Sequence, residues 1–490
     1  MDERETTSGG DLADADSLLG MLQRGRGKGY LAALEAPPQT VWPLLYECVT
    51  NDPRLDRLED RVEYYASLIL KTAMDLEPLQ EYVRQNDNRR DSYGWKVTNF
   101  ALGTLEDLAD RGNRQALEIL RDYAAYGHDW ELITLCFDGL GVPGAMEGIG
   151  EILFRRIKGD SQIHAQFLSR IEEDWSRYCR QDEETRRRCG FLLPICEPWK
   201  SLCEQNSELA DLFAGVGIAY DRPVPPREKP SEEYLAGLSL EDLFSQVDKS
   251  NCIRFWRVLP EKVSMEHEDY LLRQLATGDP CYTILAHRGL GKLGTPRAFE
   301  ALRSYIETSE NADSKVRRYA FQAIGQIPGR LTLETARQWW RRQEWYLQVA
   351  GGGILENHAT PDDVPLLLEA LRMPEAIRRE DRRLPSALDA LARLDGIGPI
   401  PEVEQVFCQV QHSFDRCRAA DAMAATAPTH FTAEYAFECL WDCHWNTRGL
   451  GCEMVSLSMP GALERLRELA QDPNEIDPVR WPARERLEDF

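Results

Sequence analysis

Arginine and tryptophan residues alternate along one short stretch in the second half of the chain. Interleaved guanidinium groups and indole rings are typical of surfaces that stack on nucleic-acid bases, and also of the energetic centres of protein interfaces. In the alternative interpretation, the tryptophans divide between core and surface and the arginine stems cover them. Against an acidic chain, a protein is the better candidate for the partner. The candidate partner-binding residues are Arg337, Trp339, Trp340, Arg341, Arg342 and Trp345.

A second group of potentially reactive side chains lies near the C-terminus. Thiolates and imidazoles are zinc ligands, and two cysteines four residues apart on a helix would share one face. The surrounding sequence is rich in aromatic residues and lacks the paired, closely spaced ligands of a zinc knuckle, which favours buried core cysteines over a metal site. We therefore predict no metal, while the question stays open for Cys439, Cys443, His444 and Cys452.

Two other motifs give weaker signals. Cys189, Cys196 and Cys203 are evenly spaced, but intervening prolines would break a helix that joined them. The segment 24–30 combines glycines with basic residues but lacks the Lys-Ser/Thr ending of a phosphate-binding loop. We expect it to form a turn between helices, with glycines at positive φ, and it remains a candidate contact for an acidic partner.

Composition limits the classes of partner. The 490 residues include 82 acidic and 58 basic side chains, and the formal net charge is −24. This charge repels polyanions and disfavours binding to nucleic acid or to anionic membranes, so only a local basic patch would permit such a role. The acidic start of the sequence is unlike a signal peptide, no apolar run suggests a membrane span, and the 13 cysteines are scattered. We expect a soluble cytoplasmic protein that contacts no membrane.

The elements that must position these residues are helices. From Ile284 to Pro328, a helix with small residues near its end is followed by a Gly-Thr-Pro turn, an amphipathic helix, a polar break and a second small-residue helix. Small residues such as Gly291 and Gly325 would let a neighbouring helix approach closely. Such a helix pair cannot bury its apolar face alone, so the pattern predicts stacked repeats.

The domain organisation follows from composition and pattern. Fainter copies of the helix pair recur in the N-terminal half, and a proline-rich, charged stretch without apolar periodicity separates the two halves. The predicted segments are a disordered acidic tail at 1–16, a degenerate helical-repeat domain at 17–220, a linker or loop at 221–232, a repeat domain at 233–470, and a polar tail or cap at 471–490.

The sequence VRRYAFQAIGQIP (Val316 to Pro328) resembles the Val-Arg-x-x-Ala-x-x-Ala-Leu-Gly helix of bacterial HEAT repeats, especially the short variety known from phycobilisome lyases. The resemblance is good in about two repeats, weaker between Leu384 and Ala470 and around Leu102 to Tyr123, and absent near 160–260. It implies an all-α fold, an α-solenoid of antiparallel helix pairs that is degenerate in the N-terminal half. It says little about function, because the family includes scaffolds, lyases and nucleic-acid enzymes.

Three functions remain open at this point. The first is a non-enzymatic protein-binding scaffold or adaptor with no catalytic residue and no cofactor. The second is a lyase or chaperone-like enzyme similar to phycobilisome lyases, which the resemblance alone implies. The third is a HEAT-like DNA glycosylase using Trp339, Trp340, Arg341 and a carboxylate such as Asp362, which the net charge opposes. The scaffold is the preferred hypothesis.

Overall fold

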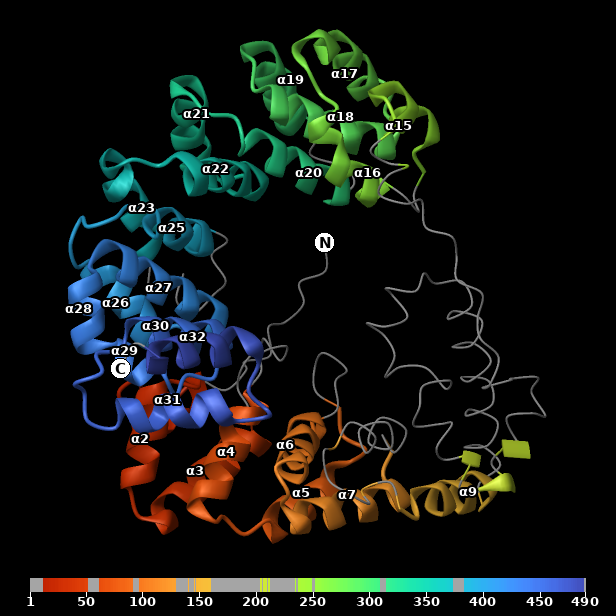
Figure 1. Cartoon of the computed structure of the whole chain (residues 1–490), viewed down its shortest axis with the longest axis vertical. Helices are drawn as coiled ribbons and strands as arrows, with labels where there is room; N and C mark the ends of the chain where they lie inside the picture. The colour runs from red at the N-terminus through yellow and green to blue at the C-terminus, as the bar shows by residue number, and fades with distance from the viewer. Residues whose placement is uncertain are drawn as a thin grey trace. The chain divides into compact units, whose positions relative to one another are not determined.

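The computed structural model describes residues 12–51, 61–90, 97–128, 140, 145, 147–159, isolated positions between 203 and 211, 234, 237–248, 252–308, 314–372 and 383–488. Over these residues the fold is helical and contains no β-strand (Figure 1). No helix within those ranges is both long enough and apolar enough to cross a bilayer. The chain divides into two compact units. One comprises residues 1–228 with 441–443, and the other 229–440 with 444–490.

The first unit is built from short helices around one hydrophobic core, to which Leu22, Tyr65, Leu105 and Tyr123 contribute. Ser17 caps α1, since its hydroxyl accepts a hydrogen bond from the Gly20 amide. The helices are α1 (Leu18–Arg24), α2 (Gly27–Glu35), α3 (Pro38–Thr50), α4 (Val62–Thr72), α5 (Glu77–Asn86), α6 (Asn99–Asp110), α7 (Arg114–Tyr126) and α9 (Ile149–Gly159).

A turn precedes α1 at the start of the described chain. It is formed at residues 15 and 16, within the segment 1–16 that was predicted as a tail, while residues 1–11 lie outside the described ranges. The Ala13 amide donates to the side chain of Gln23, and Arg24 donates to the Ala13 carbonyl. These long-range hydrogen bonds, which sequence composition does not reveal, hold the turn against α1.

The segment 24–30 contains the helix–helix turn that the sequence predicts, at Gly25 and Arg26. Gly25 ends α1 in the left-handed conformation with φ 68°, but Gly27 and Gly29 belong to α2. Arg24 and Arg26 are buried, so this segment does not present its arginines to a partner.

Over its described residues, the second unit contains the remaining helices and three short 3₁₀ turns. They are α15 (Leu240–Gln246), α16 (Cys252–Val258), η2 (Leu259–Glu261), η3 (Met265–His267), α17 (Glu268–Leu275), α18 (Pro280–Leu293), α19 (Pro296–Thr308), α20 (Ser314–Ile324), α21 (Arg330–Trp340), α22 (Trp345–His358), η4 (Pro361–Asp363), α23 (Val364–Leu371), α25 (Arg383–Leu391), α26 (Pro401–Gln409), α27 (Ser413–Thr426), α28 (Pro428–Glu434), α29 (Ala436–Cys439), α30 (Trp445–Met454), α31 (Ala462–Gln471) and α32 (Asp477–Glu488).

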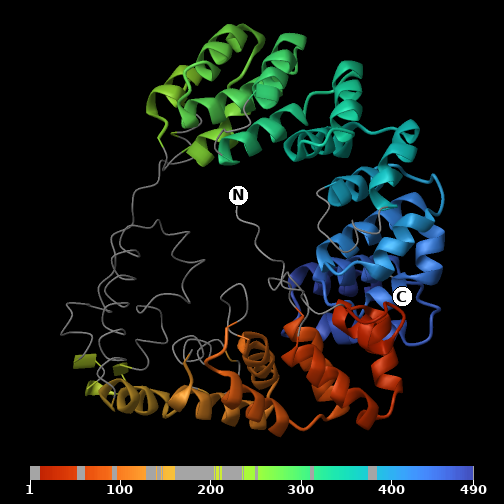
Figure 2. The same ribbon diagram turned by 180° about the vertical axis from the view of Figure 1, so that it is seen from behind.

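Helices of this unit alternate between two rows. In the first row, α18, α20, α22, α25, α27, α30 and α32 each pack against the next member. In the second row, α17, α19, α21, α23, α26 and α31 each pack against a member of the first. Figure 1 shows α20 and α22 along one edge of the unit and α19 and α21 along the other, and Figure 2 shows the same helices from behind.

Glycines at the ends of two first-row helices explain how closely the helices approach. A side-chain carbon added at Gly291 would lie 2.7 Å from the carbonyl oxygen of Ala323 in α20. One added at Gly325 would lie 2.9 Å from the carbonyl oxygen of Gly353 in α22. Both distances are shorter than van der Waals contact, which confirms the prediction that small residues permit close helix packing.

The last predicted segment, 471–490, is folded over its described part. It contains α32, which packs against α30 and α31 and buries Val479 and Ala483. The predicted linker at 221–232 lies outside the described residues.

Candidate functional site

The six candidate residues lie at the end of α21, in the following turn and at the start of α22. Helix α21 packs closely along α22, which places the two adjacent tryptophans in the core. Trp339 is 4% exposed and Trp340 is fully buried. Both indoles therefore stabilise the fold and are not available to a partner in this conformation. This agrees with the alternative interpretation, in which some of the tryptophans belong to the core.

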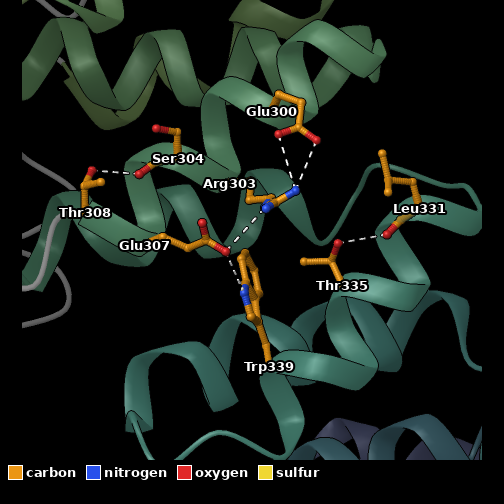
Figure 3. A network of polar contacts seen from close by, with 8 residues as sticks. All are labelled: Glu300, Arg303, Ser304, Glu307, Thr308, Leu331, Thr335 and Trp339. Atoms are coloured by element: carbon orange, nitrogen blue, oxygen red, sulfur yellow. Dashed lines mark hydrogen bonds and ion pairs between the residues drawn. The ribbon is translucent and has the colours of Figure 1, made fainter.

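Trp339 also connects α21 to α19 through a polar network (Figure 3). Its indole N–H donates to Glu307 Oε1 at 3.1 Å, and the guanidinium of Arg303 bonds the same carboxylate oxygen at 3.3 Å. Arg303 also reaches Glu300 one helical turn away, at 3.3 Å. The network provides a hydrogen-bond acceptor for the indole nitrogen of the buried Trp339. Without an acceptor, burial of that N–H group would cost free energy.

Arg337 forms a fork-shaped ion pair with Asp363 of η4. Its Nε and Nη2 atoms lie 2.6 and 3.2 Å from the two carboxylate oxygens. The Asp363 side chain is only 1% exposed and also accepts hydrogen bonds from the amide and hydroxyl of Thr360. Burial alone would raise the pKa of Asp363, but these hydrogen bonds outweigh it and lower the pKa. Arg337 thus anchors η4 to α21.

The other three candidate residues are on the surface. Arg341 is 59% exposed and lies 3.6 Å from Glu369. Arg342 pairs with Glu344 at 2.7 Å, and its hydrogen bond is the main reason why the pKa of Glu344 falls to about 2. Trp345 is 45% exposed, so nearly half of a large apolar side chain faces water at the first position of α22.

Arg317 of α20 is buried next to Trp345. Its guanidinium lies 5.6 Å from the centre of the Trp345 ring and 5.4 Å from that of Tyr346. The structure shows that it reaches the next first-row helix and that aromatic rings are among its contacts there.

The cluster therefore does not form one continuous surface. We define the α21–α22 surface as Arg341, Arg342 and Trp345. Each arginine is paired with a carboxylate of the chain itself, which weakens the case for a strongly acidic partner at this place. Trp345, with Arg317 over its ring, is the group with the most binding potential.

The C-terminal cysteines are core residues in the structure. Helix α29 ends at Cys439, so Cys439 and Cys443 do not share a continuous helix, and Cys439 instead packs against Gly451 of α30. All three thiols are buried, and burial raises the pKa of Cys452 to about 12. No group of three or more ligating side chains is arranged to hold a metal within the described ranges.

Of the other candidate residues, the structure describes Cys203 and Asp362. Cys203 is buried, while Cys189 and Cys196 lie outside the described residues. Asp362 is exposed next to Asp363, but the tryptophans with which it would form a glycosylase-like site are buried.

Comparison with known proteins adds no assignment. No protein-family model matches this sequence, and no curated protein matches it.

Proposed function

We propose that the protein is a non-enzymatic scaffold or adaptor, in which HEAT-like helix pairs form an α-solenoid that presents an extended surface to a protein partner. Two observations support the repeat arrangement. First-row helices pack consecutively from α18 to α32, and glycines lie at the equivalent contacts α18–α20 and α20–α22. A stack of this kind buries its core between neighbours and leaves long faces free for binding.

The observation that carries the binding proposal is Trp345. An indole exposed at the start of a first-row helix, held in place by Arg317, is a pre-positioned aromatic anchor. Arg341 and Arg342 lie in the turn directly before it and supply a polar rim. We expect the partner to insert an apolar side chain beside Trp345 and to accept hydrogen bonds from the flanking arginines.

Affinity capture with the purified full-length chain tests the proposal. Wild type is compared with Trp345→Ala, with the double variant Arg341→Gln, Arg342→Gln, and with Leu331→Ala as a control for loss of another exposed apolar side chain. We expect one partner, identified by mass spectrometry and reconstituted from purified components, to bind wild type and the control but to lose affinity by about tenfold or more for Trp345→Ala. Equal affinity for all four proteins would overturn the assignment of this surface.

A further inference from the structure

A second surface differs from the α21–α22 surface in that several of its basic side chains form no ion pair within the described parts of the chain. Helices α16, α18 and α20 contain seven arginine and lysine residues and no acidic residue, in a chain whose acidic residues otherwise outnumber its basic ones. Helix α18 packs against both α16 and α20, so the three form one neighbourhood within the second unit (Figure 1). The fold has therefore gathered positive charge in one place.

Trp256 joins the three helices on their partly exposed side. The guanidinium of Arg288 in α18 lies over the Trp256 ring of α16, 4.2 Å from its centre. The same ring packs against Tyr319 of α20 at 5.6 Å. Arg288 and Trp256 are half-buried, and Arg288 donates to the Gln326 side chain at 2.9 Å, so the guanidinium is held in a fixed orientation.

The charge of Arg288 is not compensated. Its Nε atom is buried without a hydrogen-bond partner, and burial lowers the pKa of Arg288. In the described parts of the chain, five basic residues of these helices form no ion pair with a carboxylate. They are Arg254, Arg257, Arg288, Lys292 and Arg318. A partly desolvated cation without a counter-ion is unfavourable by itself, and an incoming carboxylate would relieve that cost.

We infer that this basic platform, defined as Trp256, Arg257, Arg288, Lys292, Arg318 and Tyr319, binds an acidic peptide segment of a partner protein. Arg288 receives a carboxylate, and the exposed cations Arg257, Lys292 and Arg318 receive neighbouring ones. The edges of Trp256 and Tyr319 contact the apolar parts of the peptide. The inference rests on the proposed scaffold function, but it uses different residues and specifies the chemistry of the partner.

The charge of the whole chain decides between a peptide and a nucleic acid. A long polyanion would extend beyond the platform, where the net charge of −24 repels it. Nucleic-acid binding also depends on neutralising many successive phosphates. A short acidic segment carries only a few charges, which the four cations of the platform can match.

Selection from a random-peptide display library against the purified full-length chain tests the inference without knowledge of the partner. We expect the enriched peptides to be net negative. In fluorescence polarisation their affinity should fall about tenfold or more for Arg288→Gln and for the double variant Arg257→Gln, Arg318→Gln. Both residues of the double variant are exposed, so we expect that variant to fold. It therefore tests the inference even if Arg288→Gln does not fold. The matched control is Arg273→Gln, which removes the same charge from an exposed position on α17.

Three outcomes would overturn the inference. One is enrichment of peptides without negative charge, another is binding that the platform variants leave unchanged, and the third is a labelled single-stranded oligonucleotide that binds the platform more tightly than any selected peptide. Trp345→Ala separates this proposal from the α21–α22 surface. If the platform is the site, the Trp345→Ala protein should bind the selected peptides as tightly as wild type does. This expectation does not depend on the result of the partner-capture experiment.

Discussion

The close contact between α18 and α20 predicts that replacing Gly291 by alanine has a different effect from the same replacement at Gly353 of α22. Both Gly291 and Gly353 lie within first-row helices, where replacement by alanine ordinarily adds about 1 kcal/mol of helix stability. At Gly291 the new carbon would lie 2.7 Å from the Ala323 oxygen and 2.9 Å from its Cα atom, and both belong to backbone that cannot rotate away. At Gly353 the nearest atom, the Phe321 oxygen, is 3.9 Å away.

The two substitutions should therefore have opposite effects. Gly353→Ala should stabilise the second unit by about 0.5–1 kcal/mol, because it gains helix propensity at no steric cost. Gly291→Ala must push α18 away from α20, and overpacking of this kind outweighs the gain, for a net loss of about 1–3 kcal/mol.

Urea unfolding followed by circular dichroism measures the difference. Because a chain of two units need not unfold in one step, amide hydrogen exchange read by mass spectrometry should locate the effect. Exchange in α18 and α20 should accelerate about tenfold for Gly291→Ala and slow in α22 for Gly353→Ala. A Gly291→Ala protein as stable as Gly353→Ala would refute the packing argument.

Three further perturbations test individual contacts. Trp339→Phe should cost about 1–3 kcal/mol of unfolding free energy, because a smaller ring leaves a gap in the core and the hydrogen bond to Glu307 is lost, and partner capture should be unaffected. Asp363→Ala should cost about 2–4 kcal/mol in the same urea experiment, since it leaves Arg337 and the η4 turn without their buried acceptor; a change below about 0.5 kcal/mol would contradict the anchor role. Desolvation by packed neighbours, reinforced by the nearby carboxylate of Asp389, raises the pKa of Asp421 from 3.8 to about 6, although part of its side chain is exposed. The folded state therefore prefers the protonated form, and stability is lost as the pH rises through that interval. Asp421→Asn should raise the Tm at about pH 7.5 and change it little at about pH 3.5, whereas an equal shift at both would exclude titration as the cause.

Local signals in the sequence predicted local structure well. The turn at Gly25 and the close approach at Gly291 each depend on one residue type and its immediate neighbours. The helical class followed from apolar periodicity in the same way, because that period is a property of a single segment.

The sites were harder to predict because they depend on tertiary partners. Nothing in the local sequence distinguishes the buried Trp339 and Trp340 from the exposed Trp345, since burial is decided by which helix packs on which face. The carboxylate that pairs with Arg337 stands 26 residues further along the chain. The basic platform was missed because its residues are dispersed over three helices. The absence of acidic residues from those helices is the signal that could have revealed it.

Site-specific photo-crosslinking in the native host tests the central claim most directly. A photoreactive phenylalanine analogue is placed at Trp345 and, as the control, at Met265, another exposed apolar residue of the same unit. The scaffold proposal predicts one abundant crosslinked protein at position 345 that is absent at 265 and is lost when Arg341 and Arg342 are both changed to glutamate. Equal crosslinking at both positions, or none at 345 in a folded protein, would contradict it.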